Sequence, residues 1–213
     1  MIRFITFEGG DGTGKTTQLT ILESHLTARG KSCISTREPG GTSLGKLIRQ
    51  VLLEIGDQSI TSPTELFLYL ADRAQHIQEV VGPAIEQGKI VLCDRHTDST
   101  LAYQGYGRGL ELGLLRHLND IASQGVKPDL TFLLDCPVAL GMSRTAQRRF
   151  QSATKARRED RFEREKMEFH ERVRTGFLEL ARLEPDRFCV LDASRSLREV
   201  ADEMKKIVDQ KIT

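Results

Sequence analysis

The sequence lacks the features that mark a membrane, secreted or strongly charged protein. No apolar run approaches the roughly 18 residues of a membrane-spanning helix, and the N-terminal stretch MIRFITFEGG has neither the apolar segment nor the cleavage site of a signal peptide. The 31 lysines and arginines almost balance the 30 aspartates and glutamates, so no global charge directs the chain to nucleic acid or to an acidic membrane. We expect a cytoplasmic protein with neither nucleic-acid nor membrane partners, in which any basic recognition site is local.

The four cysteines also lack the C-x-x-C spacing of a metal site. Each lies in or directly after a short apolar run of the kind that forms strands. We therefore expect reduced thiols packed in or beside a core. These residues are Cys33, Cys93, Cys136 and Cys189.

Short strand-like runs alternate with helical stretches along the chain. The runs cover residues 2–8, 32–37, 89–94, 130–135 and 188–192. Several are apolar almost throughout, which is typical of strands covered by helices on both faces. The alternation predicts a parallel sheet with right-handed crossovers. We see no repeat, linker or domain boundary, so we predict a single α/β domain over residues 1–213, with a doubly wound five-stranded sheet and the first strand in its centre.

Two helix starts are marked by their residue types. In SPTE, Ser62 is the predicted N-cap, with Pro63 at the first helical position and Glu65 three residues after the cap; in SLRE, Ser196 and Glu199 have the same spacing. Behind the first start, apolar residues recur at helical spacing, which predicts a buried stripe. The stripe consists of Phe67, Leu70, Ala74, Ile77 and Val81.

The stretch FEGGDGTGKTT, residues 7–17, matches the phosphate-loop pattern G-x-x-x-x-G-K-[ST]. A strand-like run precedes it and an amphipathic helical stretch follows, which is the context this motif requires. Glycines let backbone N–H groups surround phosphate oxygens, Lys15 supplies a charge for the β- and γ-phosphates, and the Thr16 hydroxyl is a hard ligand for Mg²⁺. The predicted ATP-binding residues are Gly9, Gly10, Asp11, Gly12, Thr13, Gly14, Lys15, Thr16 and Thr17.

A phosphate loop alone does not identify the reaction, because GTPases, motor ATPases and small-molecule kinases share it. The chain has no Asn-Lys-x-Asp sequence for reading guanine, and it is short for an oligomeric ATPase. The remaining motifs must therefore decide between a kinase and a regulatory NTPase.

Four further motifs follow the loop in order: TREPGGTSLGKLIRQVLL, ELFLYLADRAQH, DRHTDSTLAYQGYGRG and DRFE. Together with FEGGDGTGKTT they resemble the bacterial thymidylate kinases, from residue 2 to about residue 192. The resemblance implies a P-loop nucleoside monophosphate kinase that transfers the γ-phosphate of ATP, with Mg²⁺, to dTMP in dTTP biosynthesis. It also implies a homodimer formed through the helices around residues 64–86. The alternatives are another nucleoside monophosphate or deoxynucleoside kinase, or a nucleotide-binding regulatory NTPase.

The resemblance assigns a first group of residues to the acceptor dTMP. Arg49 matches the arginine that grips the acceptor phosphate, for which a guanidinium fork is well suited. Tyr69 and Arg73 are four residues apart and share one helix face; they match the residues that stack on thymine and bond its carbonyl edge. The family more often has Phe where this chain has Tyr69, so Phe67 is the alternative stacking residue.

A second group follows the third strand-like run. A carboxylate at the end of a buried strand beside a phosphate loop is suited to organise Mg²⁺, which predicts Asp94 as a metal residue. Asp135 ends a similar run and is the alternative. By resemblance, Arg95 bridges the donor and acceptor phosphates, and Asp11 contacts the 3′-hydroxyl of the acceptor sugar. The resemblance also implies that Ser99, Thr100, Tyr103 and Gln104 line the nucleoside. In the family, the tyrosine ring excludes a ribose 2′-hydroxyl and the glutamine lies near the base.

Residues 144–161, RTAQRRFQSATKARREDR, carry seven Lys or Arg against two acids. A solvated helix surface is one reading of this run, but its position matches the mobile lid of nucleotide kinases. In the thymidylate kinases, the arginine that neutralises the transferring phosphoryl group lies either in the phosphate loop or in the lid. Gly12 follows Asp11 here, so we predict a lid arginine, Arg157, with Arg148, Arg149 and Arg158 as alternatives. The predicted catalytic residues are Asp11, Lys15, Arg95 and Arg157.

Overall fold

The computed structural model describes residues 2–54, 60–151, 162 and 165–211. The five predicted runs all form strands: β1 (Phe4–Glu8), β2 (Cys33–Arg37), β3 (Ile90–Asp94), β4 (Leu130–Asp135) and β5 (Phe188–Asp192). They make one parallel sheet in the order β2-β3-β1-β4-β5, so the strand before the phosphate loop is central, as predicted. In its middle, Thr6 of β1 pairs with Cys93 and Thr131.

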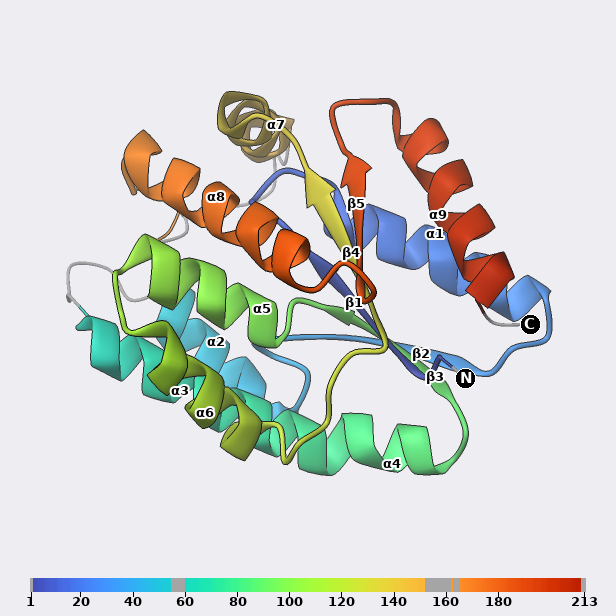
Figure 1. The fold of residues 1–213 in the computed structure, drawn as a ribbon, viewed down its shortest axis with the longest axis horizontal. Coiled ribbons are helices and arrows are strands. Elements are labelled where there is room, and N and C mark those ends of the chain that lie inside the picture. The colour runs from blue at the N-terminus through green and yellow to red at the C-terminus, as the bar shows by residue number, and fades with distance from the viewer. Residues whose placement is uncertain (1, 55–59, 152–161, 163–164, 212–213) are drawn as a thin grey trace.

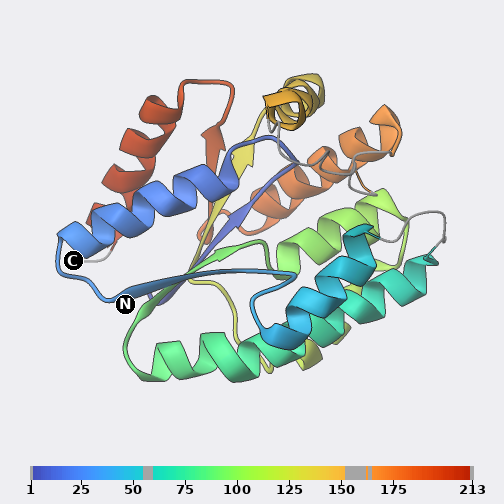
Figure 2. The same cartoon turned by 180° about the vertical axis from the view of Figure 1, so that it is seen from behind.

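Helices cover both faces of this sheet, as expected for a doubly wound fold (Figures 1 and 2). The helices are α1 (Lys15–Ala28), α2 (Ser43–Glu54), α3 (Ser62–His76), α4 (Gly82–Glu86), α5 (Thr97–Thr100), α6 (Leu112–Ala122), α7 (Val138–Gln151), α8 (Met167–Leu183) and α9 (Leu197–Lys211). Two π-helical segments, η1 (Ile77–Val81) and η2 (Leu101–Gly107), lie between them.

Each face of the sheet has its own apolar core. Phe7 and Phe132 are fully buried and pack with side chains of α1 and α9 on one face. On the other face, Leu133 packs with α3, η2 and α8, and Val91 packs with η1 and α4. All five residues of β1 are buried, whereas the edge strands β2 and β5 are partly exposed. This burial explains why the central strands are apolar almost throughout.

The free cysteines agree with the prediction of packed thiols. Cys93 and Cys136 are buried and Cys33 and Cys189 are half-buried, with no disulfide between them. Separately, none of the helices in the described ranges combines the length and the apolar composition that a membrane span requires.

The prediction of Ser62 as N-cap was wrong by one residue. Thr61 caps α3: it has extended backbone angles, and its hydroxyl accepts a hydrogen bond from the Thr64 amide at 3.5 Å. Ser62 is the first helical residue and Pro63 the second. Pro is accepted there because backbone N–H groups in the first turn of a helix have no intrahelical partner. The second predicted cap is confirmed, because Ser196 and Glu199 exchange the hydrogen bonds of a capping box.

The predicted apolar stripe of α3 was partly wrong. Phe67 is 61% exposed, while the neighbouring Leu66 is buried. The buried face of the helix also carries Asp72 and Arg73, whose charges have partners inside the protein. The buried face of α3 therefore includes Leu66, Asp72 and Arg73 and leaves out Phe67, so the spacing of apolar residues alone does not locate it.

Candidate functional site

The phosphate loop joins the carboxyl end of β1 to the first turn of α1. Gly9, Gly12 and Gly14 have positive φ angles of 129°, 78° and 95°, which side chains rarely adopt. The loop also packs backbone against backbone on the first turns of α7: a Cβ atom at Gly12 would lie 2.0 Å from the carbonyl oxygen of Gly141. Glycine is thus required at position 12 by both conformation and space.

The side chain of Lys15 folds back onto the phosphate loop. Its side chain is buried, and Nζ donates to the carbonyl oxygens of Gly10 at 2.7 Å and Gly9 at 3.1 Å. Burial, together with the nearby Arg95 charge, lowers the pKa of Lys15 to about 8. The ammonium group is therefore strongly desolvated, and it would gain from an anion placed in the loop.

Thr16 and Asp94 meet at the mouth of the loop, with Thr16 Oγ1 donating to Asp94 Oδ2 at 2.7 Å. Hard oxygen atoms of this kind suit Mg²⁺, which is usually bound by one or two protein groups together with substrate phosphates and water. Within the described ranges, no group of three or more His, Cys, Asp or Glu side chains is gathered as a metal site. The alternative residue, Asp135, forms a two-point ion pair with Arg174 at 2.8 Å.

Arg95 connects the phosphate loop to the segment that follows β3. Its φ of 72° is a left-handed conformation that is rare for a side chain of this size and is concentrated at functional sites. The guanidinium donates to Asp11 Oδ1 at 2.6 Å, to Gly9 O at 3.0 Å, and to the hydroxyls of Ser99 and Tyr103 at 3.1 Å. The strained backbone is thus compensated by a dense set of bonds that fix the cation.

Asp11 shares this arrangement of charges. Burial raises the pKa of its carboxyl, but Arg95 and Lys15 outweigh burial, so the pKa of Asp11 lies below its ordinary value. An ionised carboxylate therefore faces the two cations at neutral pH.

Glu8 is a buried residue of the site that sequence reasoning missed. It ends β1, and its carboxyl accepts from the His96 amide at 2.8 Å and from the Ser99 hydroxyl at 2.6 Å. Burial, and then the negative charge of Asp98, raises the pKa of Glu8 to about 8. The available signal was a single acidic residue closing a strand that is otherwise apolar.

Beside the loop lies a cleft of about 570 Å³, to which we refer as the acceptor cleft. All nine residues predicted to bind dTMP line it: Asp11, Arg49, Tyr69, Arg73, Arg95, Ser99, Thr100, Tyr103 and Gln104. Glu38, Pro39, Leu53, His96 and Phe162 also line it and were not predicted. Tyr69 lies in the wall of the cleft, whereas the alternative residue Phe67 does not.

Glu38 joins three segments around the acceptor cleft. Its buried carboxylate accepts from Arg73 Nε at 2.8 Å, and its other oxygen lies 2.8 Å from His76 Nδ1 and 3.0 Å from His96 Nδ1. Burial raises the pKa of Glu38, but Arg73 and His96 outweigh it and hold this pKa well below its ordinary value. Sequence reasoning treated REPGG only as a turn and missed this role, because the partners of Glu38 lie far along the chain.

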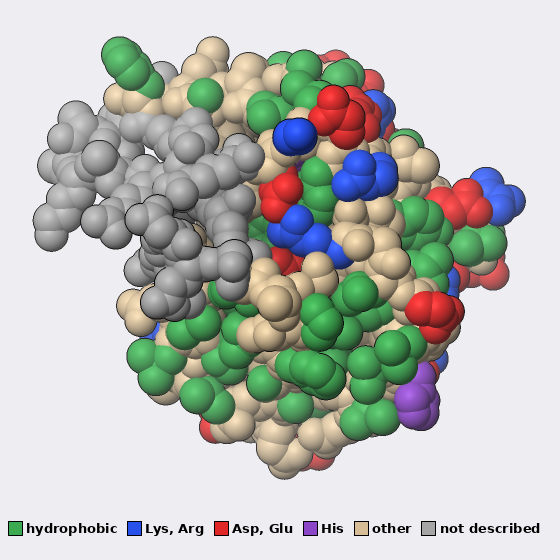
Figure 3. Space-filling model, turned by 90° about the vertical axis from the view of Figure 1, so that its left-hand side faces the viewer, with side chains coloured by type: hydrophobic (Ala, Val, Ile, Leu, Met, Phe, Trp, Pro, Cys, Tyr) green, Lys and Arg blue, Asp and Glu red, His purple; other side chains and the backbone are tan. Residues whose placement is uncertain are grey.

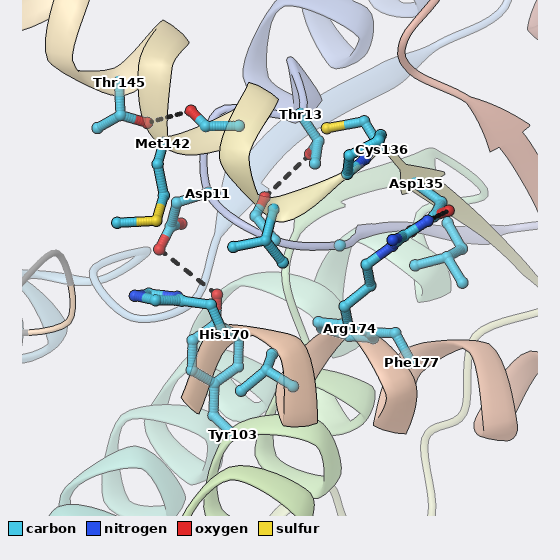
Figure 4. Close-up of a pocket in the computed structure, with 17 residues that line it drawn as sticks. Asp11, Thr13, Tyr103, Asp135, Cys136, Met142, Thr145, His170, Arg174 and Phe177 are labelled. Atoms are coloured by element: carbon cyan, nitrogen blue, oxygen red, sulfur yellow. Dashed lines mark hydrogen bonds and ion pairs between the residues drawn. The ribbon is translucent and has the colours of Figure 1, made fainter. Parts of the chain in front are cut away.

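A second cavity of about 700 Å³ lies between the phosphate loop, the end of β4, α7 and α8. Its lining is mainly apolar, with the Asp135–Arg174 pair at one side (Figure 4). Asp11 and Tyr103 line both cavities, and the Tyr103 hydroxyl donates to Asp11 Oδ2 at 3.5 Å. These two residues therefore form the wall between the acceptor cleft and the second cavity.

The predicted lid is only partly described. Residues 144–151 form the last two turns of α7, in which Arg144 donates to the Ala193 carbonyl at 2.7 Å and Arg148 to the Thr145 hydroxyl at 3.4 Å. Arg157 and Arg158 lie outside the described residues, as does the side chain of Arg149. The choice among the lid arginines therefore stays a prediction.

Comparison with known proteins gives one consistent result. The sequence model of the family described as thymidylate kinase matches residues 7–204. The chain is 50% identical over 206 residues to the thymidylate kinase of Desulfovibrio desulfuricans, covering 97% of this chain and 94% of that protein. It is 53% identical over 196 residues to that of Geotalea uraniireducens, with 92% and 91% covered. The crystal structure of thymidylate kinase from Ehrlichia chaffeensis superposes with a TM-score of 0.77 at 34% identity, covering 97% of this chain and 98% of that one.

The buried Glu8 predicts an unusual dependence of stability on pH. Because its pKa is raised to about 8 in the folded protein, the folded state holds a proton that the unfolded state loses at its ordinary, lower pKa. The contribution of Glu8 to the free energy of unfolding is therefore fully present at low pH and decreases as the pH rises towards 8. We expect wild type to lose about 1–3 kcal/mol relative to Glu8→Gln between pH 5 and pH 8.

Urea unfolding of both proteins at pH 5, 6.5 and 8 measures this difference. Glu86→Gln is the matched control, because Glu86 is an exposed glutamate for which we expect a change below about 0.5 kcal/mol at every pH. Parallel pH profiles for wild type and Glu8→Gln would show that Glu8 is ionised in the folded protein.

Proposed function

The chain belongs to the thymidylate kinase family, and from this membership we propose which of its residues carry each part of the reaction. It phosphorylates dTMP to dTDP, with ATP as the phosphate donor. The observation that supports the residue assignment is the convergence of nine predicted dTMP residues on one cleft beside the phosphate loop. The reaction needs two nucleotides brought end to end, and these two sites are adjacent.

On the donor side, the loop glycines and the N-terminus of α1 surround the phosphates of ATP, and Lys15 contacts the β- and γ-phosphates. We propose that Thr16 and Asp94 hold Mg²⁺, directly or through water. The metal, when bound, neutralises charge on the phosphates of the donor. The burial of Lys15 strengthens its attraction for these phosphates, because water screens the charge less there.

On the acceptor side, Arg49 binds the phosphate of dTMP, and Arg95 lies between the two phosphates, where charge accumulates in the transition state. Tyr69 stacks on the thymine ring and Arg73 donates to its carbonyl edge. Asp11 bonds the 3′-hydroxyl, and Tyr103 fills the space that a ribose 2′-hydroxyl would need. The fixed position of Arg95 removes the need to reorganise it during the reaction.

Phosphoryl transfer of this kind depends on alignment and charge neutralisation more than on covalent or acid–base help. The acceptor phosphate is already ionised at neutral pH, so no general base is required. The cations of the site, Lys15 and Arg95, lie beside the carboxylate of Asp11, which keeps them in place. This arrangement favours a kinase over a regulatory NTPase, which needs no acceptor cleft.

A coupled assay of ADP release tests the donor and acceptor assignments together. Wild type with Mg·ATP should release ADP with dTMP in preference to dCMP, AMP, GMP and UMP, and chelation of Mg²⁺ should abolish the release. Lys15→Ala should lose at least about 10²-fold in kcat because it removes a phosphate contact, and a cooperative thermal unfolding transition checks that the variant is still folded. Activity of Lys15→Ala close to wild type would refute the donor site.

We propose that residues 144–161 form a lid within a single kinase domain and that Arg157 supplies the missing cation. Arg157→Ala should lower the single-turnover rate on the order of 10³-fold with little change in KM for dTMP, because a lid contact forms mainly in the closed complex. Arg148→Ala tests the first alternative residue, and we expect it to change the barrier by less than about 0.5 kcal/mol. If Arg148→Ala is inactive and Arg157→Ala is normal, the lid is correct and the named residue is wrong.

A homodimer is also proposed, with its interface on α3, which begins the expected segment 64–86, and on the neighbouring helices α2 and α6, which lie outside that segment. These helices expose large apolar side chains, and hydrophobic side chains gather on one face of the molecule beside a hollow with charged groups (Figure 3). Such a patch is more apolar than a free surface usually is. The exposed residues are Leu44, Leu47, Val51, Phe67, Leu114 and Ile121.

Sedimentation velocity at micromolar concentration tests the dimer. Wild type should sediment as a dimer, and Phe67→Glu should shift it towards monomer, because a charge would be buried in the interface. Phe150→Glu is the control, since Phe150 is 93% exposed on α7, away from these helices. A monomeric wild type would contradict the proposal.

The four free thiols also support our proposal of a reducing, cytoplasmic location, which cell fractionation measures.

A further inference from the structure

Gln104 lies in the π-helical segment η2 and reaches the acceptor cleft from a buried position. Its side chain is 1% exposed, lines the cleft, and donates from Nε2 to Glu65 Oε1 at 2.8 Å. Glu65 itself is fully buried in the first turn of α3. The amide is therefore anchored from behind by a carboxylate that takes no part in lining the cleft.

Arg108 holds that carboxylate in place. Its Nε lies 3.4 Å from Glu65 Oε1 and its Nη2 lies 3.3 Å from Oε2, while Nη1 donates to Glu165 at 2.5 Å. The guanidinium also lies 4.6 Å above the Phe169 ring. A carboxylate paired with a guanidinium only accepts hydrogen bonds. The Gln104 group that faces Glu65 must therefore be the donor, the amide NH₂.

This anchoring determines which end of the amide faces the cleft. With Nε2 turned towards Glu65, Oε1 remains for the cleft, and none of the described residues donates a hydrogen bond to it. Arg73 is fixed in a similar way: Nε is bonded to Glu38, and Nη1 to Thr100 and Asn119. Its Nη2 has no hydrogen-bond partner within the described part of the chain. Gln104 and Arg73 thus offer the cleft one acceptor and one donor, each held by a buried carboxylate.

We propose that Glu65 is a positioning residue for base selection: it fixes the Gln104 amide with its oxygen towards the acceptor base. This rests on the proposed binding of the base beside Tyr69, Arg73 and Gln104. A base with a carbonyl next to an N–H, as in thymine and uracil, matches the donor of Arg73 and the acceptor of Gln104. Cytosine has the reverse pattern: its amino group would face the donor of Arg73, and its unprotonated ring nitrogen would face the acceptor oxygen of Gln104.

Glu65→Gln separates this role from a purely structural one. Arg108 donates only, so it would hold the oxygen of the new amide and turn its NH₂ towards Gln104. Gln104 would then accept with Oε1 and present its own NH₂ to the base. We expect kcat/KM to fall by about 10- to 100-fold for both dTMP and dUMP but not for dCMP, with KM for ATP unchanged. The dTMP:dCMP ratio should thus fall at least about 10-fold.

Glu165→Gln is the matched control. It removes the same charge from the same partner, Arg108, and Glu165 has no hydrogen bond to Gln104. Its dTMP:dCMP ratio should stay within about 2-fold of wild type. A ratio that changes equally in Glu65→Gln and Glu165→Gln, or in neither, overturns the proposal.

Gln104→Met distinguishes failure of this inference from failure of the proposed site. If Gln104→Met leaves the ratio unchanged, Gln104 does not read the base and the acceptor-site assignment fails. If it collapses the ratio while Glu65→Gln does not, only the role of Glu65 is wrong. When Gln104 is already replaced, Glu65→Gln should reduce the ratio no further.

A measurement on the wild-type protein covers the case in which Glu65→Gln does not fold. The side-chain NH₂ signals of Gln104, assigned by their loss in Gln104→Met, should be protected from exchange with D₂O. They should also move little when dTMP binds, since the NH₂ faces Glu65. Rapid exchange, or a large shift of these signals on adding dTMP, would show that the NH₂ faces the cleft and would overturn the proposal.

Discussion

The buried ion pair between Glu38 and Arg73 is the interaction on which the acceptor cleft depends. Taking a carboxylate out of water costs several kcal/mol, which is recovered here only because a guanidinium and two imidazoles surround it. These partners come from α3 and from the segment after β3, while Glu38 follows β2. The charge can be stable only when all three segments are in place, so the fold and the shape of the cleft are coupled.

Other buried carboxyl groups around the site also join distant segments of the chain. Glu8 joins the end of β1 to the segment after β3, Glu65 joins α3 to η2, and Asp98 is bound at two points by Arg187 just before β5. Each carboxylate is buried, and each connects elements that are distant along the chain. Removing Arg187 would leave the charge of Asp98 uncompensated, which is far more destabilising than losing an exposed ion pair. Glu8 differs, because it is held as a protonated carboxyl by hydrogen bonds. The rigidity of the cleft therefore comes from polar groups as much as from its apolar core.

Much of this architecture could be predicted because its signals are local. Apolar runs located every strand to within two residues at either end. The nine residues that the family resemblance assigned to the acceptor all line one cleft. The errors occurred where a residue is determined by a distant partner: Phe67 turned out exposed because Arg73 and Asp72 occupy the buried face of α3. Glu8, Glu38 and Glu65 were missed as site residues for the same reason, since Glu8 meets His96 across 88 positions.

The contact between Gly12 and Gly141 limits how this enzyme could change over evolution. An arginine at position 12 would need both a left-handed backbone and the space taken by the first turns of α7, and a Cβ at Gly141 would in turn lie 2.4 Å from the Asp11 carbonyl. A side chain at position 12 therefore requires the phosphate loop and the first turn of α7 to move apart. Because the two backbones must separate together, substitutions at Gly12 and at Gly141 are expected to be coupled during evolution.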